Sequence, residues 1–449
     1  MGQILNALRS IALPALAAAA LGTAVQGRAA DEAAAPTRSA GRHDFSIQID
    51  TAWNVPSSPF SAWVEGGLGK LRYDESDRGL NAARIFVDYR ARLKPGLTAR
   101  IVADHVGDGG ADADGVDVGE AYLEWRPVPT SANRHRLRTG AFYPPLSLEN
   151  GGPGWSSPFG VSFSAINTWL GEEIRPIGVE WSMRRRTRLG SPQEIGVFAA
   201  GFYGNDPAGT LLFWRGWSLH DRQTRLHDRL PMPPLPLWSD GAIVGHEEQW
   251  LEPFDEIDGK PGGYAGVEWR YGRRALVQLS RYDNRADPYA FSGGQWGWHT
   301  RFNHLSAQLA LPRGFGLIAQ WLDGSTDWLT ATTPDGRHTP FTEHVEDTLE
   351  AKYVMLTRLV RDAHRVSLRY DGFEVRRDEA PPQLVADSGR AWTLAYRYER
   401  PALFDVTVEW QQIGSRRDLW PFLYGAQPRA RERILSVGVV LRLDSSRLR

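Results

Sequence analysis

The chain has 449 residues and no cysteine, which excludes a disulfide framework and thiolate metal sites. Its 52 basic and 53 acidic residues give a formal net charge of -1, without the basic excess of a nucleic-acid-binding protein. Glycine contributes 46 residues and aromatic residues 11% of the chain, a composition compatible with a transmembrane barrel, whose strands alternate polar and apolar residues.

The first thirty residues have the pattern of a secretory signal peptide. Arg9 is the only charged residue before an apolar run from Ile11 to Val25, and small residues follow it. The run is too short and too rich in alanine for a spanning helix, which needs about 20 apolar residues. We therefore predict a signal peptide over residues 1–30, cleaved between Gly27 and Ala35, and an exported protein.

From residue 61 onward, apolar and polar residues alternate with a period of two, as they do on the two faces of a β-strand. Around residues 83–93, for example, Ile85 and Val87 alternate with Arg84 and Asp88. The pattern predicts sixteen strands, at residues 61–72, 83–93, 97–105, 117–126, 135–143, 174–183, 194–203, 264–271, 275–283, 296–311, 315–322, 348–358, 365–371, 391–399, 403–411 and 433–442.

The connections between these strands alternate in length. Short ones carry Pro or Gly beside basic residues, and long ones lie between them, the longest at about 204–262. Short periplasmic turns and long outer loops are the plan of a bacterial outer-membrane barrel. We therefore predict an all-β fold, a transmembrane antiparallel β-barrel of about sixteen strands over residues 61–443, with a C-terminal tail at 444–449.

The strand-like segment at residues 43–53 has no place in a barrel with this parity. We assign it to the periplasm or the pore, as an extra segment of an N-terminal linker at residues 31–60. Outward aromatic residues cluster near the strand ends, for example Phe404 near a short turn and Tyr143 near a long loop. This favours a membrane barrel over a soluble β-sandwich or propeller, because no helical segments are predicted that could cover the outward faces.

The residues that alternate with the outward apolar face are densely charged, and we expect them to line a water-filled lumen. Arginine rings favour anions and carboxylate rings favour cations, but most of these charges are expected to brace one another in pairs. The candidate pore-lining and constriction residues are Arg84, Arg90, Arg92, Arg100, Arg136, Arg138, Glu149, Trp155, Glu172, Glu173, Arg175, Lys352, Arg365, Arg369 and Arg397.

The segment after the strand at 135–143 is the most distinctive local feature. It leads through two prolines into an aromatic, glycine-rich stretch that is suited to fold inward as the third outer loop. Gly140, Phe142, Pro144 and Glu149 resemble the signature of the phosphate-selective porin O/P family, Gly-x-[Phe/Tyr]-x-Pro-…-Glu. The resemblance implies an anion channel, with phosphate among its solutes, and a homotrimer. The chain departs from the family in its few lysines, since only Lys352 is predicted to be lumenal.

Two further groups of residues contain side chains of the kinds found in metal or hydrolytic sites. Asp104, Asp108, Asp112, Asp114 and Asp117 lack the closing Glu of a calcium loop, and a surface loop is the better interpretation. The histidines and acids of the 204–262 loop match no zinc or nucleophile motif, and we interpret that loop as an outer vestibule or a plug. The residues of this second group are His220, Asp221, His227, Asp228, His246, Glu247 and Glu248.

The sequence thus predicts a non-enzymatic porin-type channel in the outer membrane of a Gram-negative bacterium, with no catalytic residue, metal or cofactor. Small hydrophilic solutes would diffuse through it, and its other expected partners are membrane lipid and lipopolysaccharide, not nucleic acid. Two alternatives stay open. One is an outer-membrane lipid hydrolase, for which we find no convincing Ser–His pair, and the other is a plugged structural or adhesive barrel.

Overall fold

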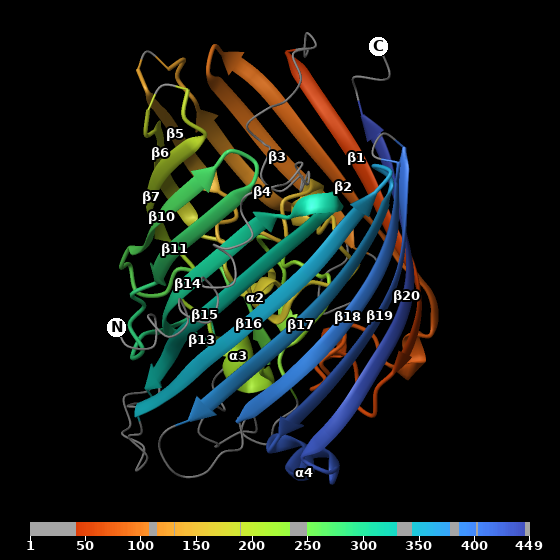
Figure 1. The fold of residues 1–449 in the computed structure, drawn as a ribbon. Coiled ribbons are helices and arrows are strands. Elements are labelled where there is room, and N and C mark those ends of the chain that lie inside the picture. The colour runs from red at the N-terminus through yellow and green to blue at the C-terminus, as the bar shows by residue number, and fades with distance from the viewer. Residues whose placement is uncertain are drawn as a thin grey trace.

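The computed structural model describes residues 42–106, 115–129, 131–188, 190–233, 249–329, 344–377, 386–400 and 403–444. Sixteen strands, each antiparallel to its neighbours, form a closed barrel (Figure 1). None of the helices in these ranges is long and apolar enough to cross a membrane. In barrel order the strands are β1 (His43–Ser57), β2 (Gly79–Lys94), β3 (Leu97–Val106), β4 (Val116–Trp125), β5 (Asn133–Ala141), β6 (Ile177–Arg186), β7 (Gln193–Tyr203), β10 (Gly262–Tyr271), β11 (Ala275–Asp283), β14 (His299–Ala310), β15 (Phe315–Leu329), β16 (His344–Val360), β17 (His364–Arg377), β18 (Asp387–Arg400), β19 (Phe404–Arg417) and β20 (Arg429–Asp444).

Strand β1 closes the barrel, so the assignment of residues 43–53 to the periplasm or the pore is wrong. β1 pairs with β20 from Ser46 to Ser57 and with β2 along its other edge. Residues 61–72, predicted as the first strand, lie inside the barrel instead, where Leu71 is buried. The number of strands is unchanged because one segment replaces the other. Residues 1–41 lie outside the described ranges, and the signal peptide stays a prediction.

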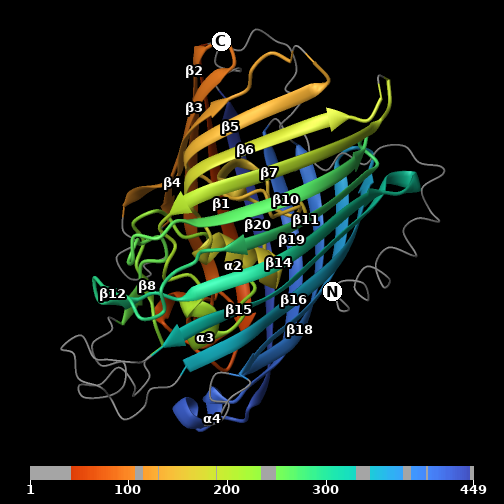
Figure 2. The same ribbon diagram turned by 90° about the vertical axis from the view of Figure 1, so that its left-hand side faces the viewer.

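The two rims of the barrel differ as the sequence predicted. Connections after β2, β4, β6, β10, β14, β16 and β18 span seven residues or fewer, and the other eight span nine or more. Figure 2 shows the strands tilted across the wall, with the long connections gathered at one end. By the plan of such barrels, the short turns mark the periplasmic rim and the long loops the outer rim.

The outward face of the wall carries an apolar band. On β19, Val406, Val408 and Trp410 point outward, and Val408 and Trp410 are exposed. Apolar side chains continue the band over the neighbouring strands, among them Leu394 of β18 and Leu435 of β20, which flank Trp410 in the sheet. An exposed apolar band around a closed barrel is what a lipid bilayer covers.

Long loops fold back into the barrel and fill much of its interior. Helix α2 (Ala165–Glu173) belongs to the third outer loop and α3 (Thr210–Arg215) to the fourth, and both lie within the ring of strands (Figure 1). Every residue of α2 and α3 is buried. The remaining short elements are η2 (Trp63–Glu65), η3 (Glu75–Asp77), η4 (Pro153–Trp155), β8 (Leu230–Pro231), β9 (Trp250–Leu251), β12 (Phe291–Ser292), β13 (Gln295–Trp296), η6 (Pro312–Gly314) and α4 (Leu419–Tyr424).

Much of the interior is a packed core, so the prediction of a water-filled lumen is wrong for this region. Inward side chains of the wall such as Tyr282, Phe302 and Tyr353 form one buried cluster with Trp169 and Ile166 of α2. Tyr282 and Phe302 stack with their ring centroids 4.9 Å apart, and Trp169 packs edge-on against Phe302. Such packing leaves few gaps, because side chains interdigitate as they do in a soluble core.

Candidate functional site

An open cavity of about 550 Å³ lies inside the barrel at the short-turn end. It extends from the turn residues Arg126 and Pro127 to Pro144 and Trp155 of the third outer loop. Its wall carries more arginines than carboxylates. The charged lining residues are Arg100, Glu120, Arg126, Arg134, Arg136, Arg138, Arg184, Glu268 and Arg270.

Two carboxylates each bind two arginines of this wall. Glu180 accepts a hydrogen bond from Arg136 Nη2 at 2.8 Å and one from Arg138 Nη2 at 2.9 Å. Glu268 likewise binds Arg184 and Arg270, the latter through Nη2 at 3.1 Å. Each group of two arginines and one glutamate carries one net positive charge, because arginine stays protonated in proteins. The cavity therefore presents positive charge to any solute that enters it.

The third outer loop is held in the barrel by a buried arginine of the wall. Arg369 Nη1 on β17 donates to Glu149 Oε1 at 2.6 Å and to the Ser162 carbonyl at 2.9 Å, and Nη2 donates to the Phe163 carbonyl at 2.8 Å. Glu149 Oε2 in turn accepts from the backbone N–H of Ser164, which caps α2. These groups are all buried. Arg369 thus serves as an anchor for the loop.

A wall carboxylate anchors the first and fourth outer loops together. Asp387 Oδ2 on β18 accepts from Lys70 Nζ of the first loop at 2.6 Å and from the Trp217 N–H of the fourth at 2.9 Å. Lys70 also donates its backbone N–H to Glu432 of β20 at 3.0 Å. Lys70 is fully buried and Asp387 is 2% exposed, so the ion pair is sequestered from water.

The predicted pore-lining residues fall into three groups in the structure. Arg100, Arg136, Arg138 and Trp155 line the open cavity, and Arg90 and Arg92 lie on β2 toward the short-turn rim, half exposed. The others, apart from Lys352, are largely buried and contact or belong to the inserted loops: Arg84, Glu149, Glu172, Glu173, Arg175, Arg365, Arg369 and Arg397.

Lys352 faces away from the lumen, so its assignment to the pore is wrong. Its neighbours on β16, Ala351 and Tyr353, point inward and belong to the packed core. The Lys352 side chain is 60% exposed and pairs with Glu350 at 3.1 Å on the outer surface. Tyr143, predicted on the outward face, is also inside, where its ring stacks on Trp155. Both errors have one cause. The inserted loops make the interior apolar, so apolar side chains in this part of the barrel do not mark the lipid-facing side.

Sequence reasoning missed Arg184 and Arg270 of the cavity wall. The strand predicted at 174–183 stopped one residue before Arg184, whereas β6 continues to Arg186. Arg270 lies two residues after Glu268 on the same face of β10. Its inward position could therefore have been predicted from the alternation of polar and apolar residues. Asp387 and Lys70 were missed because nothing in their local sequence marks a contact between positions 317 residues apart.

The described residues of the aspartate group and of the histidine-containing fourth loop have structural partners. His220 Nε2 lies 3.1 Å from Glu172, and the His227 N–H donates to Asp117 at 2.9 Å. Asp104 faces Arg225 at 3.6 Å. These contacts tie the fourth loop to α2 and to the wall, in agreement with the plug interpretation. Asp108, Asp112, Asp114, His246, Glu247 and Glu248 lie outside the described residues.

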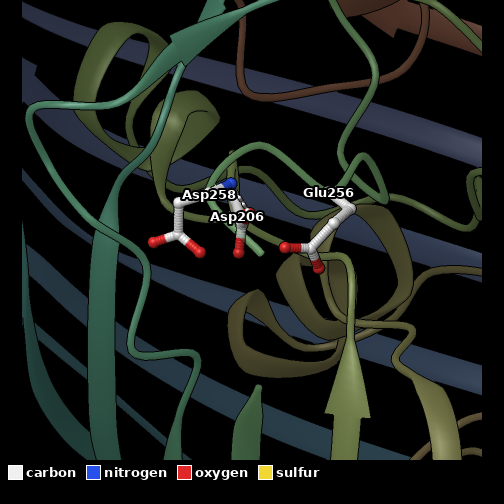
Figure 3. Close-up of side chains that lie close together, drawn as sticks. All are labelled: Asp206, Glu256 and Asp258. Atoms are coloured by element: carbon white, nitrogen blue, oxygen red, sulfur yellow. Dashed lines mark hydrogen bonds between the residues drawn. The ribbon is translucent and has the colours of Figure 1, made fainter. Parts of the chain in front are cut away.

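A cluster of three carboxylates lies where the fourth outer loop leaves and rejoins the wall (Figure 3). Ligand atoms of Asp206, Glu256 and Asp258 lie within 4.8 Å of one another. Most of their oxygens accept backbone hydrogen bonds, such as Ile257 N–H to Asp206 Oδ2 at 2.6 Å and Gly204 N–H to Glu256 Oε2 at 2.6 Å. These bonds explain the cluster as a clamp that joins the two ends of the loop.

The carboxylate clamp predicts a pH dependence for this loop. Burial raises the pKa of Asp206 to about 6, above its usual value of 3.8. The folded loop therefore binds a proton between these pH values that the unfolded loop releases, and the loop loses stability as pH rises through about 6. Hydrogen exchange at the Ile257 and Asp258 amides, corrected for intrinsic rates, should show more protection at pH 5 than at pH 7. Asp206→Asn should remove this difference, and an unchanged difference in the variant would contradict the assignment.

Comparisons with known proteins support the fold. No family model matches the chain, and no curated protein matches it. The outer membrane channel DcaP of Acinetobacter baumannii aligns with a TM-score of 0.50 and 11% identity, over 89% of this chain and 96% of that one. A loop-deletion mutant of OmpT, an outer membrane protein of Vibrio cholerae, gives 0.47 and 10% identity, over 89% and 99%. The anion-selective porin from Comamonas acidovorans gives 0.45 and 12% identity, over 89% and 98%.

The architecture defines the class of protein. A closed sixteen-stranded antiparallel barrel with an outward apolar band and unequal rims is a transmembrane barrel of the outer-membrane type. The alignment with DcaP over 89% of this chain shows the same overall fold.

Proposed function

We propose that the chain is an outer-membrane channel for small hydrophilic solutes, with a preference for anions. The observation that carries this proposal is the open cavity, which is lined by two pairs of arginines that share Glu180 and Glu268 respectively. A positive lining lowers the energy of anions in a narrow aqueous passage and raises that of cations. The description of DcaP as an outer membrane channel supports the same activity.

The inserted loops set the expected size of the current. Because the packed core occupies the barrel beyond the cavity, solutes must pass beside or between loops that fill most of the cross-section. We therefore expect a small conductance compared with sixteen-stranded porins that keep an open aqueous channel. Phosphate as a preferred solute and a homotrimeric assembly follow from the resemblance to the phosphate-selective porin O/P family, and both are part of this proposal.

The second candidate function is a closed barrel with a structural or adhesive role. The packed core within the wall favours it, since Trp169, Phe302 and Tyr353 leave little space between α2 and the strands. The two candidates differ in one measurement. A channel conducts in a planar bilayer without any change to the loops, whereas a closed barrel conducts only after the loops are trimmed.

Ion selectivity tests the proposed function. In a potassium chloride gradient across a planar bilayer, the reversal potential of the wild type should indicate anion preference. The double variant Arg136→Ala, Arg184→Ala removes one positive charge from each arginine pair and should move the reversal potential toward cation preference. Lys352→Ala is the matched control, because it removes a positive charge from the outer surface of the same barrel. A cation-selective wild type, or equal shifts in variant and control, would contradict the proposal.

A further inference from the structure

The outward residues of β18, β19 and β20 form regular transverse rows near the outer rim. Strand pairing places Ser388, Arg416 and Arg429 in one row, Arg390, Gly414 and Arg431 in the next, and Trp392, Gln412 and Arg433 in the third. Five of these nine residues are arginine and none is acidic. We call the five the outer basic face: Arg390, Arg416, Arg429, Arg431 and Arg433, all exposed.

The outer basic face lies next to the apolar band, on its side toward the outer rim. The next row toward the membrane centre is Leu394, Trp410 and Leu435, each at least 40% exposed. Together with Trp392, Trp410 supplies aromatic rings at the height where the interface between lipid chains and headgroups is expected. The arginines therefore lie at the level of the headgroups in the outer leaflet.

The centre of the outer basic face is a notch. Gly414 lies between Arg390 and Arg431, and a Cβ atom added to it would meet nothing within 4 Å. Neighbouring strands are about 4.8 Å apart, so the Cα atoms of these two arginines are about 10 Å from each other. Two flexible side chains at that separation can converge on one anion held over the glycine. Guanidinium groups suit a phosphate in particular, since they bind its oxygens with paired hydrogen bonds.

Few local carboxylates compete for these arginines. Arg416 Nε donates to Asp418 at 3.0 Å and Arg433 Nε donates to the neutral Gln412 at 3.0 Å. Within the part of the chain that the structure describes, Arg390, Arg429 and Arg431 have no ion-pair partner. On the same three strands, the outward face near the short-turn rim carries only Arg400 as a basic residue. The positive charge is therefore confined to the outer side.

The neighbouring part of the outer surface is different. On β14 to β16 the outward polar residues are of both signs, and they neutralise one another in pairs such as Arg301 with Glu346 at 3.0 Å and Lys352 with Glu350 at 3.1 Å. A face of mixed sign is expected simply from exposure at the rim. A face of one sign beside an aromatic row is instead complementary to anionic headgroups at that height.

We propose that the outer basic face binds a phosphate group on the headgroup of a glycolipid in the outer leaflet. The phosphate lies over Gly414 between Arg390 and Arg431, and the acyl chains run down the wall along Trp410 and Leu435. Arg416 and Arg433 flank the same notch from above and below. Basic clusters beside a membrane surface attract anionic headgroups, and arginine adds directional hydrogen bonds to that attraction. This site is independent of the channel activity.

Binding of lipid A to the purified full-length barrel tests the proposal. Native mass spectrometry in a mild detergent should detect bound diphosphorylated lipid A on the wild type. The double variant Arg390→Ala, Arg431→Ala should bind at least tenfold more weakly, and Gly414→Glu, which places a carboxylate in the notch, should lose binding without removing an arginine. All these positions face outward, and heat-modifiable migration in a gel checks that each barrel is folded.

The control and the probes make the result decisive. The matched control Arg400→Ala, Lys352→Ala removes two outward positive charges elsewhere and should bind like the wild type. Enzymatically dephosphorylated lipid A should bind weakly, and inorganic phosphate at equal concentration should not displace the glycolipid. The proposal is overturned by equal binding of both lipid forms, by equal loss in variant and control, or by displacement with free phosphate. It is also overturned if the double variant changes only the oligomeric state, which would make the face a contact between copies.

Discussion

Replacing Asp387 by Ala is expected to release two inserted loops at once and to raise the conductance of the barrel several-fold. The carboxylate is the shared acceptor for Lys70 of the first outer loop and for Trp217 of the fourth. Without it, the Lys70 ammonium is left in a site that excludes water. Removing one partner of such a buried pair costs about 3–5 kcal/mol, which favours withdrawal of the loops. A sixteen-stranded wall freed of its loops leaves an aqueous channel.

Single-channel recording in planar bilayers measures this effect, and a double variant separates charge from packing. Lys70→Met with Asp387→Leu removes both charges and fills their space with apolar side chains. Such replacements of a buried ion pair are often neutral or stabilising, and only the Trp217 N–H loses its acceptor, so the double variant should conduct less than Asp387→Ala. Equal conductance in Asp387→Ala and the wild type would show that the loops are held mainly by other contacts.

The strands were predictable because alternation is a local property. In β19, the outward residue Trp410 lies between the inward residues Glu409 and Gln411. This alternation can be recognised without knowledge of any distant contact. The same holds for the lengths of the connections. Strand number, parity and the unequal rims therefore follow from the sequence, and the structure confirms them.

The first strand was misassigned because alternation does not distinguish a wall strand from an extended loop in a packed lumen. Residues 61–72 alternate small or polar residues with larger ones and lie near the expected start of the barrel. Their partners, such as Asp387 and Glu432, are more than 300 residues away in the sequence. Only the pairing of β1 with β20 decides which segment closes the ring.

Some residues of the candidate site were misassigned for a related reason. The sequence identifies which residues alternate, but the side that faces lipid is inferred from where apolar residues lie. In the outer half of β16 that inference fails, because Leu349, Ala351 and Tyr353 pack against the loops inside while Lys352 faces out. Where the lumen is open, as at Arg136 and Arg138, the inference succeeds.

Replacing Arg369 by Met is expected to free the third outer loop from the wall. The guanidinium binds Glu149, the Ser162 carbonyl and the Phe163 carbonyl. All of these groups are buried away from solvent. Loss of the cation leaves the fully buried Glu149 and Asp371 without their shared charged partner, at a cost of about 3–5 kcal/mol. Lysine cannot substitute well, since a single ammonium lacks the planar fork that reaches three acceptors.

Because the chain contains no cysteine, one introduced thiol can report the position of the loop. Ala165, the first residue of α2, is 1% exposed, so an Ala165→Cys thiol should react slowly with a membrane-impermeant maleimide in the otherwise unchanged barrel. In the Arg369→Met background the same thiol should react at least tenfold faster. Adding Glu149→Gln to that background neutralises one of the two stranded carboxylates, the one that belongs to the loop, and should slow the reaction again in part. In the wild type, Glu149 also accepts hydrogen bonds from the Ser164 N–H and the Asn167 side-chain amide. The side-chain oxygen of a glutamine at this position can accept the same two bonds. Labelling as fast as in the Arg369→Met background would mean that the unpaired charge of Glu149 is not what releases the loop.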